Sequence, residues 1–196
     1  MPTPPSPTAI AVAVRRQMAG EFARDSCIAA ARITIEVCDY FGIKARPLPV
    51  RVAAYTAMAW ELRDVLVDKP VDEWPAAAYS TGIAGGESAP GRWNGHLVAL
   101  AGLDEPEAPA WLIDASLGQL SRPSRNLPTG PAAFTLWNGL PAGPDETLVL
   151  TTKPHGVVIC YGLLDDDGWR ESPNWSRRRG YILRTAGGAI RELRGL

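Results

Sequence analysis

The clearest pattern of hydrophobic and polar positions lies in the segment 25–41. On a helical wheel with about 100° per residue, its polar residues gather in one narrow stripe, and apolar residues fill the rest of the circumference. The stripe consists of Asp25, Arg32, Glu36 and Asp39. Asp25 or Ser26 can cap the start, and Gly42 suits the left-handed position that follows a helix end. The pattern predicts a helix buried on most of its surface.

Other helices are predicted from weaker patterns. The segment 9–23 is compatible with a short helix, and 58–67 with another. The segment 68–92 is rich in Pro, Gly and Ser and is interpreted as a long loop. Residues 1–8 contain four prolines, so they are interpreted as a flexible leader before a single domain, 9–196.

Short apolar runs in the second half of the chain predict strands. The runs 96–100 and 110–113 flank a turn-forming segment and suggest two antiparallel neighbours. Further strands are expected at 147–152 and 157–164, and 181–193 is interpreted as a strand running into a short helix. Pro47 and Pro49 precede an alternating segment that ends near residue 54, which suggests an edge strand. Helices followed by strands favour an α+β fold.

Composition excludes several classes of function. The chain has 20 basic and 21 acidic residues, so no global field favours nucleic acid or an anionic membrane. Three widely spaced cysteines form no disulfide framework, which fits a reducing compartment. The apolar run 9–14 is too short for a signal peptide or membrane anchor, so we expect a cytoplasmic protein. Without paired Cys or His residues we expect no metal site, and no cofactor motif is present.

Cys27 is the strongest candidate for a nucleophile. It falls in the first turn of the helix predicted at 25–41, where unpaired N–H groups and the positive end of the dipole stabilise a thiolate. On the wheel it points toward the body of the domain. The alternative is a small buried hydrophobe. Cys38, in the middle of the same helix, and Cys160, in an apolar run, are interpreted as packing residues.

His96 and Asp114 are the candidates for a base and its orienting carboxylate. If Leu100 lies near Ala110 or Trp111 in the predicted hairpin, His96 falls opposite Asp114 or one residue from it. Directly opposite side chains share a face, with Cβ atoms about 5 Å apart, whereas a one-residue slip separates their faces. A carboxylate in an apolar strand needs a partner, although Asp114 could instead cap the following turn.

The sequence resembles the transglutaminase-like branch of the papain-like cysteine proteins. The resemblance rests on DSCIAAARITIEVCDYFGIKA, GHLVAL and WLIDASLGQLSRP, within residues 20–125. It implies a papain-like core in which a helix carrying the cysteine packs against an antiparallel sheet. It also assigns Cys27, His96 and Asp114 as the catalytic triad. The chain lacks the extended cysteine motif of animal transglutaminases, and the N-terminal signature of arylamine acetyltransferases.

The implied activity is that of a thiol hydrolase of the peptidase or amidase type, acting on a peptide, amide or acyl substrate through a thioester. Acyl transfer on the same triad and a non-catalytic binding module are the alternatives. The Cys27 backbone N–H would receive the oxyanion, with Gln17 or Asn94 as a second donor. Gln119 could instead support the site.

Overall fold

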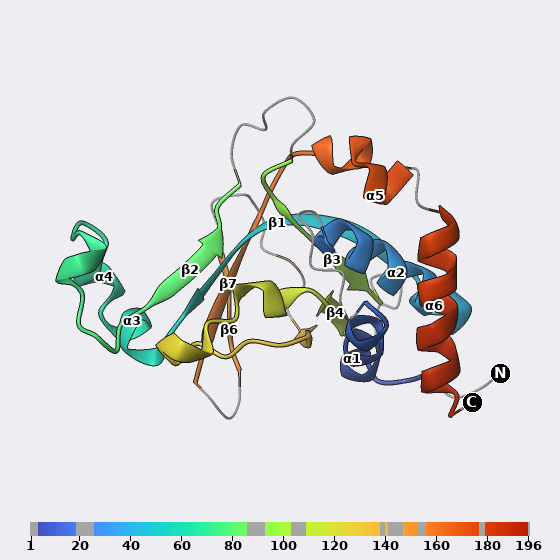
Figure 1. Ribbon diagram of the computed structural model, residues 1–196, viewed down its shortest axis with the longest axis horizontal. Coiled ribbons are helices and arrows are strands. Elements are labelled where there is room, and N and C mark those ends of the chain that lie inside the picture. Colours follow the sequence, from blue (N-terminus) through green and yellow to red (C-terminus); the bar gives the residue numbers. More distant parts are fainter. Residues whose placement is uncertain are drawn as a thin grey trace.

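The computed structural model describes residues 4–18, 26–85, 93–102, 109–137, 140, 147–152, 156–176 and 179–195. Figure 1 shows its helices and strands. The helices are α1 (Pro7–Gln17), α2 (Ser26–Tyr40), α3 (Ala57–Glu61), α4 (Arg63–Leu66), α5 (Pro173–Ser176) and α6 (Arg179–Leu193). The strands are β1 (Ala45–Tyr55), β2 (Ser80–Ile83), β3 (His96–Ala101), β4 (Ala110–Asp114), β5 (Ala132–Leu136), β6 (Thr147–Thr151) and β7 (Val158–Leu163).

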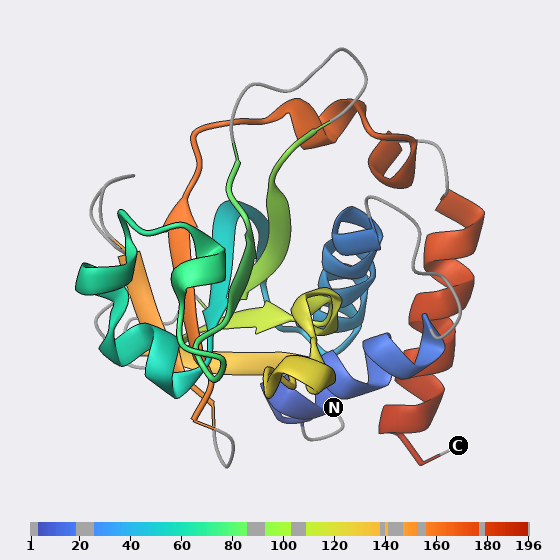
Figure 2. The same cartoon turned by 60° about the vertical axis from the view of Figure 1, so that its left-hand side comes forward.

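The strands form one antiparallel sheet in the order β5-β4-β3-β1-β7-β6, with β2 also paired to β1. The sheet curls until it is nearly closed into a barrel (Figure 2). Helix α2 packs against β3 and β1, and α1 and α6 pack against α2 and against each other. The α+β prediction is therefore confirmed, as is the packing of the cysteine-bearing helix on an antiparallel sheet.

Helix α2 ends as its sequence predicts. Gly42 has a φ of 74°, which is the left-handed conformation that glycine adopts without strain. Its N–H donates to Asp39 O at 2.9 Å, and the N–H of Ile43 donates to Cys38 O at 2.9 Å. These two bonds are those of a Schellman motif. The helix begins at Ser26, and Asp25 lies outside the described residues.

Strand β1 is central, so the prediction of an edge strand is wrong. Its first half pairs with β3, and from Val50 onward it also pairs with β7. The prolines fit because the N–H of Leu164 donates to Pro49 O at 3.1 Å. Pro49 thus directs its backbone polar groups toward β7, and its missing N–H removes no bond to β3. The same holds for Pro47, which faces the same side.

Helix α6 replaces the strand expected at the start of 181–193, and that prediction is also wrong. The segment is helical because its packing against α1 and α2 outweighs the cost of Gly187 and Gly188 within a helix. Strand β2 lies within the segment 68–92 that was expected to be a loop, and β5 was not predicted. Helix α1 begins at Pro7, inside the expected leader, with Ser6 as its N-cap.

Replacing Gly187 by alanine is expected to stabilise the protein by about 0.5–1 kcal/mol, because glycine costs that much within a helix. Apart from the backbone of its own helix, the nearest atom to the new Cβ would be Arg191 Nη1 at 3.6 Å, an ordinary contact. The measurement is the midpoint of thermal unfolding. A lower midpoint than that of the unchanged chain would contradict the helical assignment at this residue.

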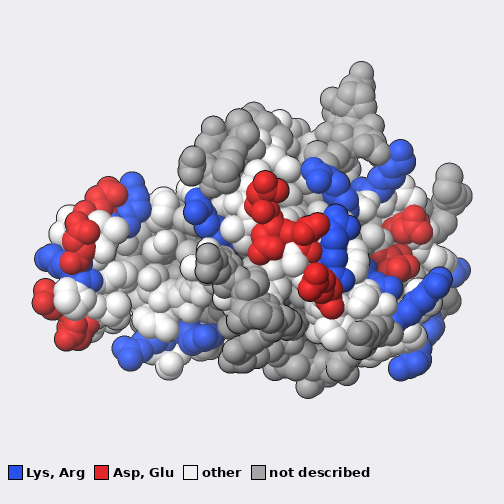
Figure 3. Space-filling view, turned by 90° about the horizontal axis from the view of Figure 1, so that it is seen from above, with Lys and Arg blue, Asp and Glu red and all other residues white. Residues whose placement is uncertain are grey.

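The surface carries charges of both signs. Seen from above, acidic and basic side chains lie interspersed on the described part of that face (Figure 3). Among the described residues, no helix is both long and apolar enough to cross a membrane.

Three hydrophobic clusters surround the strands that position the candidate site. One lies between the sheet and α1, α2 and α6, and a second fills the concave side of the sheet. The third surrounds Cys27 and includes Trp93, Leu97 and Trp169. Strand β3 is buried along its whole length, and its successive residues contribute to all three clusters. It therefore holds its first residue, His96, firmly in place.

Candidate active site

The structure brings the three predicted triad residues together from separate elements. Cys27 is the second residue of α2, His96 is the first residue of β3, and Asp114 is the last residue of β4. Their exposed fractions are 5%, 0% and 1%. Such burial of an imidazole and a carboxylate is costly unless they interact.

The β3–β4 register differs from the expected one but preserves the contact. Leu100 pairs with Leu112, not with Ala110 or Trp111. Asp114 is therefore two residues removed from the position opposite His96, and a shift of two keeps both side chains on one face. Diagonal neighbours of this kind remain within reach of long side chains. His96 Nε2 lies 2.8 Å from Asp114 Oδ2.

Each carboxylate oxygen of Asp114 accepts two hydrogen bonds. Oδ1 accepts from the Ser116 backbone N–H at 2.9 Å and from the Ser116 hydroxyl at 3.0 Å. Oδ2 accepts from Tyr161 at 3.0 Å in addition to His96. Asp114 thus contacts both the following turn and the imidazole of His96. Four donors require an ionised carboxylate, and His96 Nε2 must carry a proton.

The charges of the pair follow from these contacts. Burial lowers the pKa of His96, but the charge and hydrogen bond of Asp114, together with Cys27, outweigh it and raise that pKa to about 10. Burial raises the pKa of Asp114, but His96, Tyr161 and Ser116 outweigh it and lower that pKa. At neutral pH the pair is therefore an imidazolium bound to a carboxylate. The Tyr161 hydroxyl stays protonated, because burial and Asp114 raise its pKa.

Cys27 interacts with the imidazole ring of His96. Cys27 raises the pKa of His96 through a hydrogen bond and through its charge, and Nε2 is already bound to Asp114. Nδ1 nevertheless has no partner with strict hydrogen-bond geometry among the described residues. The sulfur therefore lies near the ring in a loose arrangement, as catalytic pairs often do before a substrate binds.

Replacing Asp114 by asparagine is expected to invert the titration of His96. In the unchanged chain, the stability from His96 is fully present below pH 6.5, its ordinary pKa, and is lost as the pH rises through about 10. Without the carboxylate charge, burial is the largest influence that remains, and Cys27 contributes less in the opposite direction. We therefore expect the His96 pKa to fall below 6.5, so that stability is lost as the pH falls through the lowered pKa. NMR of the imidazole protons measures this pKa, and His155→Gln assigns the two histidine signals. An unchanged pKa in Asp114→Asn would contradict the pairing.

The three candidates for oxyanion or support residues have different fates. Gln119 Nε2 donates to the hydroxyl of Ser26, so its amide lies at the start of α2, beside Cys27. Gln17 is exposed and its Nε2 donates to Glu192 at 3.2 Å on α6. The structure therefore directs Gln17 away from the triad and does not support its predicted role. Asn94 is exposed, two residues before His96.

Three tryptophans form an aromatic wall around Cys27. Trp93 and Trp169 are buried in its cluster, and Trp175 packs against it. Trp93 Nε1 donates to Asp166 at 2.9 Å, and Trp175 contacts Trp169 with ring centroids 4.4 Å apart. Gly95 permits the position of Trp93, because a Cβ on Gly95 would lie 2.2 Å from that ring. The wall restricts the access of water to the thiol.

Sequence reasoning missed two residues that contact Asp114. Tyr161 comes from β7, 47 residues away, and only the tertiary structure reveals its partner. A partial signal existed, because a tyrosine in a buried strand usually needs a partner for its hydroxyl. Ser116 was recognised only as part of a turn. Trp169 Nε1 is buried without a hydrogen-bond partner among the described residues.

The other cysteines and the second histidine lie elsewhere. Cys38 is in the core between α2 and α6, and burial raises its pKa to about 12. Burial likewise raises the pKa of Cys160 to about 11, although the charge of Arg63 acts in the opposite direction. His155 lies outside the described residues. Among the described residues, no three His, Cys, Asp or Glu side chains are grouped to hold a metal ion.

The chain was compared with protein-family models, with curated proteins and with solved structures. None of these comparisons found a match.

Proposed function

We propose that this protein is a cysteine-dependent enzyme that cleaves a peptide, amide or other acyl substrate through a thioester on Cys27. A papain-like core of the transglutaminase-like branch is part of the proposal. The observation that carries it is the buried His96–Asp114 pair, 2.8 Å between Nε2 and Oδ2, with Cys27 interacting with the same imidazole ring. A histidine that contacts a carboxylate and also a thiol at the start of a helix is the arrangement of a nucleophile with its base and orienting group.

The first chemical step uses the charges of the site. The form of Cys27 that reacts is the thiolate, and its sulfur lies at the positive end of α2, beside the protonated ring of His96. The sulfur attacks the carbonyl carbon, a C–S bond forms, and the carbonyl electrons move onto oxygen. That oxygen accepts a hydrogen bond from the Cys27 backbone N–H, one of the unpaired donors of the first helical turn. Gln119 is the best placed second donor, because its amide already lies at Ser26.

The second step releases the products. When the tetrahedral intermediate collapses, the bond to the leaving group breaks and His96 donates its proton to that group. A water molecule or another nucleophile then attacks the thioester while His96 accepts its proton, which regenerates the thiolate and the imidazolium. Asp114 keeps the ring in one orientation throughout, because its own position is fixed by Ser116 and Tyr161.

Acyl transfer to an organic acceptor is the second candidate. It is favoured by the aromatic wall, because Cys27 is only 5% exposed and its neighbours are Trp93, Leu97 and Trp169. Exclusion of water protects a thioester from hydrolysis. A cytoplasmic location remains part of the proposal.

Incubation with p-nitrophenyl acetate tests the proposal. We expect release of nitrophenolate and a covalent adduct of one acetyl group on Cys27, located by mass spectrometry of the digested protein. The adduct should be absent from Cys27→Ala and present in Cys38→Ala, which removes a core thiol of the same helix. Faster release on addition of glycine ethyl ester would indicate transfer, and an unchanged rate would indicate hydrolysis. Equal acetylation in the absence of Cys27 would refute the proposal.

A further inference from the structure

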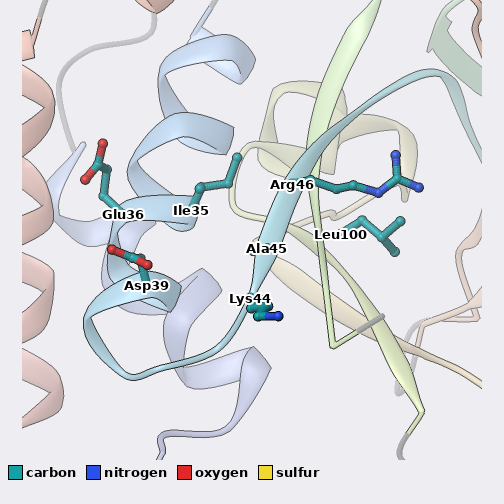
Figure 4. Close-up of a pocket in the computed structure, with 7 residues that line it drawn as sticks. All are labelled: Ile35, Glu36, Asp39, Lys44, Ala45, Arg46 and Leu100. Carbon is teal, nitrogen blue, oxygen red and sulfur yellow. The ribbon is translucent and has the colours of Figure 1, made fainter. Parts of the chain in front are cut away.

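Two cavities in the described part of the molecule lie outside the triad. The first, about 450 Å³, lies between α2 and the strands β1 and β3. Four of its seven lining residues are charged, but their charged groups do not converge. Figure 4 shows the carboxylates of Glu36 and Asp39 turned away from the guanidinium of Arg46. A cavity without convergent polar groups is a poor candidate for a ligand site.

The second cavity, about 480 Å³, has a different lining, because Arg51 is the one charged side chain among the described residues that line it. It lies across β2, β1, β7 and β6, and its floor is formed by small residues. These are Ala53, Gly82, Ala84, Cys160 and Gly162. Its volume falls within the range of roughly 300–1,000 Å³ that is typical of small-molecule sites. Along β1 and β7, residues that line this cavity alternate with residues that point into the core on the concave side of the sheet. The cavity therefore lies on the outer face of the sheet, and we call it the outer-face cavity.

The outer-face cavity has an aromatic wall at one end. Tyr55 and Trp60 line it, and their rings are in edge contact with centroids 5.6 Å apart. Trp60 comes from α3, which packs against the end of β1. Such a corner offers an apolar surface to a flat ring, which prefers offset or edge contacts with other rings.

Cationic groups lie on the same cavity, and none of the described residues that line it is acidic. Arg51 lines it, and its side chain lies across β7, because a Cβ on Gly162 would be 2.2 Å from Arg51 Nε. The guanidinium of Arg63 stacks on Trp60 at 4.4 Å from the ring centroid, and its charge reaches Cys160. Arg63 also lies 3.5 Å from Asp64 and is not among the described lining residues, whereas Arg51 lines the cavity directly. Arginine binds carboxylates in a planar, bidentate manner.

We propose that the outer-face cavity binds a small aromatic carboxylate, with its ring against Tyr55 and Trp60 and its carboxylate on Arg51. Arg51 and Tyr55 lie on one face of β1 with Ala53 between them, about 13 Å apart at their Cα atoms. That span suits an acid with two fused rings. Cys160 on the floor is a neutral thiol at neutral pH, so binding is non-covalent.

This site is separate from the triad. Cys160 faces the outer-face cavity, whereas its neighbour Tyr161 points to the other face of β7 and donates to Asp114. The site therefore does not depend on the proposed cysteine chemistry, and the Cys27→Ala variant should bind the acid as well as the unchanged chain does.

Calorimetric titration of the full chain with 2-naphthoate tests the proposal, with 2-naphthalenemethanol as the neutral comparator. We expect one saturable site, binding about tenfold weaker or more in Arg51→Gln, and binding lost in Ala53→Phe, whose ring fills the floor. Arg46→Gln is the matched control, because Arg46 lies on the same strand but lines the first cavity. It should bind as the unchanged chain does.

Three results would overturn the proposal. These are the absence of saturable binding, full binding by both Arg51→Gln and Ala53→Phe, or equal affinity for the neutral comparator. Loss of binding in Cys27→Ala would also overturn it, because the acid would then occupy the triad. Circular dichroism establishes that each variant is folded. If Ala53→Phe fails to fold, Arg51→Gln and the comparator still decide the result.

Discussion

Replacing Asp114 by alanine is expected to lower the free energy of unfolding by about 3–5 kcal/mol, the usual cost of removing one partner of a buried ion pair. Asp114 is 1% exposed and accepts four hydrogen bonds. Its loss leaves the ring of His96 and the hydroxyl of Tyr161 buried without their acceptor. Unsatisfied buried donors of this kind each cost about 1–3 kcal/mol.

Urea unfolding at neutral pH measures this effect. The matched control is Asp39→Ala, because Asp39 is exposed on α2 and surface substitutions usually stay within about 0.5 kcal/mol. A loss in Asp114→Ala no larger than that of the control would mean that the pair contributes nothing to the fold. It would also remove the argument that Asp114 fixes the imidazole.

Removing Cys27 is expected to abolish acylation by an activated ester, and His96→Gln to slow it by about 10²–10⁴-fold, the usual contribution of a positioned proton donor and acceptor. Glutamine can preserve a hydrogen bond to Asp114 but cannot accept the thiol proton. The effect should therefore appear in the rate of acylation more than in stability. Stopped-flow measurement of nitrophenolate release gives that rate.

Cys160→Ala is the control for these two variants, since Cys160 lies on the outer face of β7 and away from the triad. It should acylate at the rate of the unchanged chain. A normal rate in His96→Gln would show that the imidazole takes no part in the reaction, whatever the role of Cys27.

The helix of the candidate site could be predicted because its signals are local. Apolar periodicity and the need for a left-handed residue at Gly42 identify α2 and its end, and both are properties of adjacent residues. Strands β3, β4, β6 and β7 were also predicted from short apolar runs. The edge assignment of β1 was wrong because a proline excludes a partner on one side of a strand only, and the sequence does not say which side.

Long-range packing decided the features that could not be predicted. Gly187 and Gly188 weaken the local helix signal of α6, whose packing against α1 and α2 still makes it a helix. Gln17 is held at α6 by its hydrogen bond to Glu192. The β3–β4 register differed from expectation because the turn-forming segment between the strands does not fix it. An even shift kept His96 and Asp114 on one face, so the predicted contact was correct although its register was not.

Tyr161 and the tryptophans show what a single sequence leaves open. Each lies in an ordinary apolar stretch, and its role depends on a partner distant along the chain. Only the curled sheet brings β7 to the end of β4. The contact between His96 and Asp114 could therefore be predicted from residue type and local position, whereas the groups that hold and enclose the candidate site could not.

Alkylation of the three cysteines with iodoacetamide at pH 6, followed by peptide mass spectrometry, tests the central claim most directly. The claim is that Cys27 is the nucleophile of the site and reacts beside His96, and a thiolate is the form of a cysteine that reacts. We predict that Cys27 is labelled at least about tenfold faster than Cys38 and Cys160, whose pKa values are raised to about 12 and about 11, and that His96→Gln removes the difference. Slow and equal labelling of all three cysteines in the unchanged chain would contradict the claim.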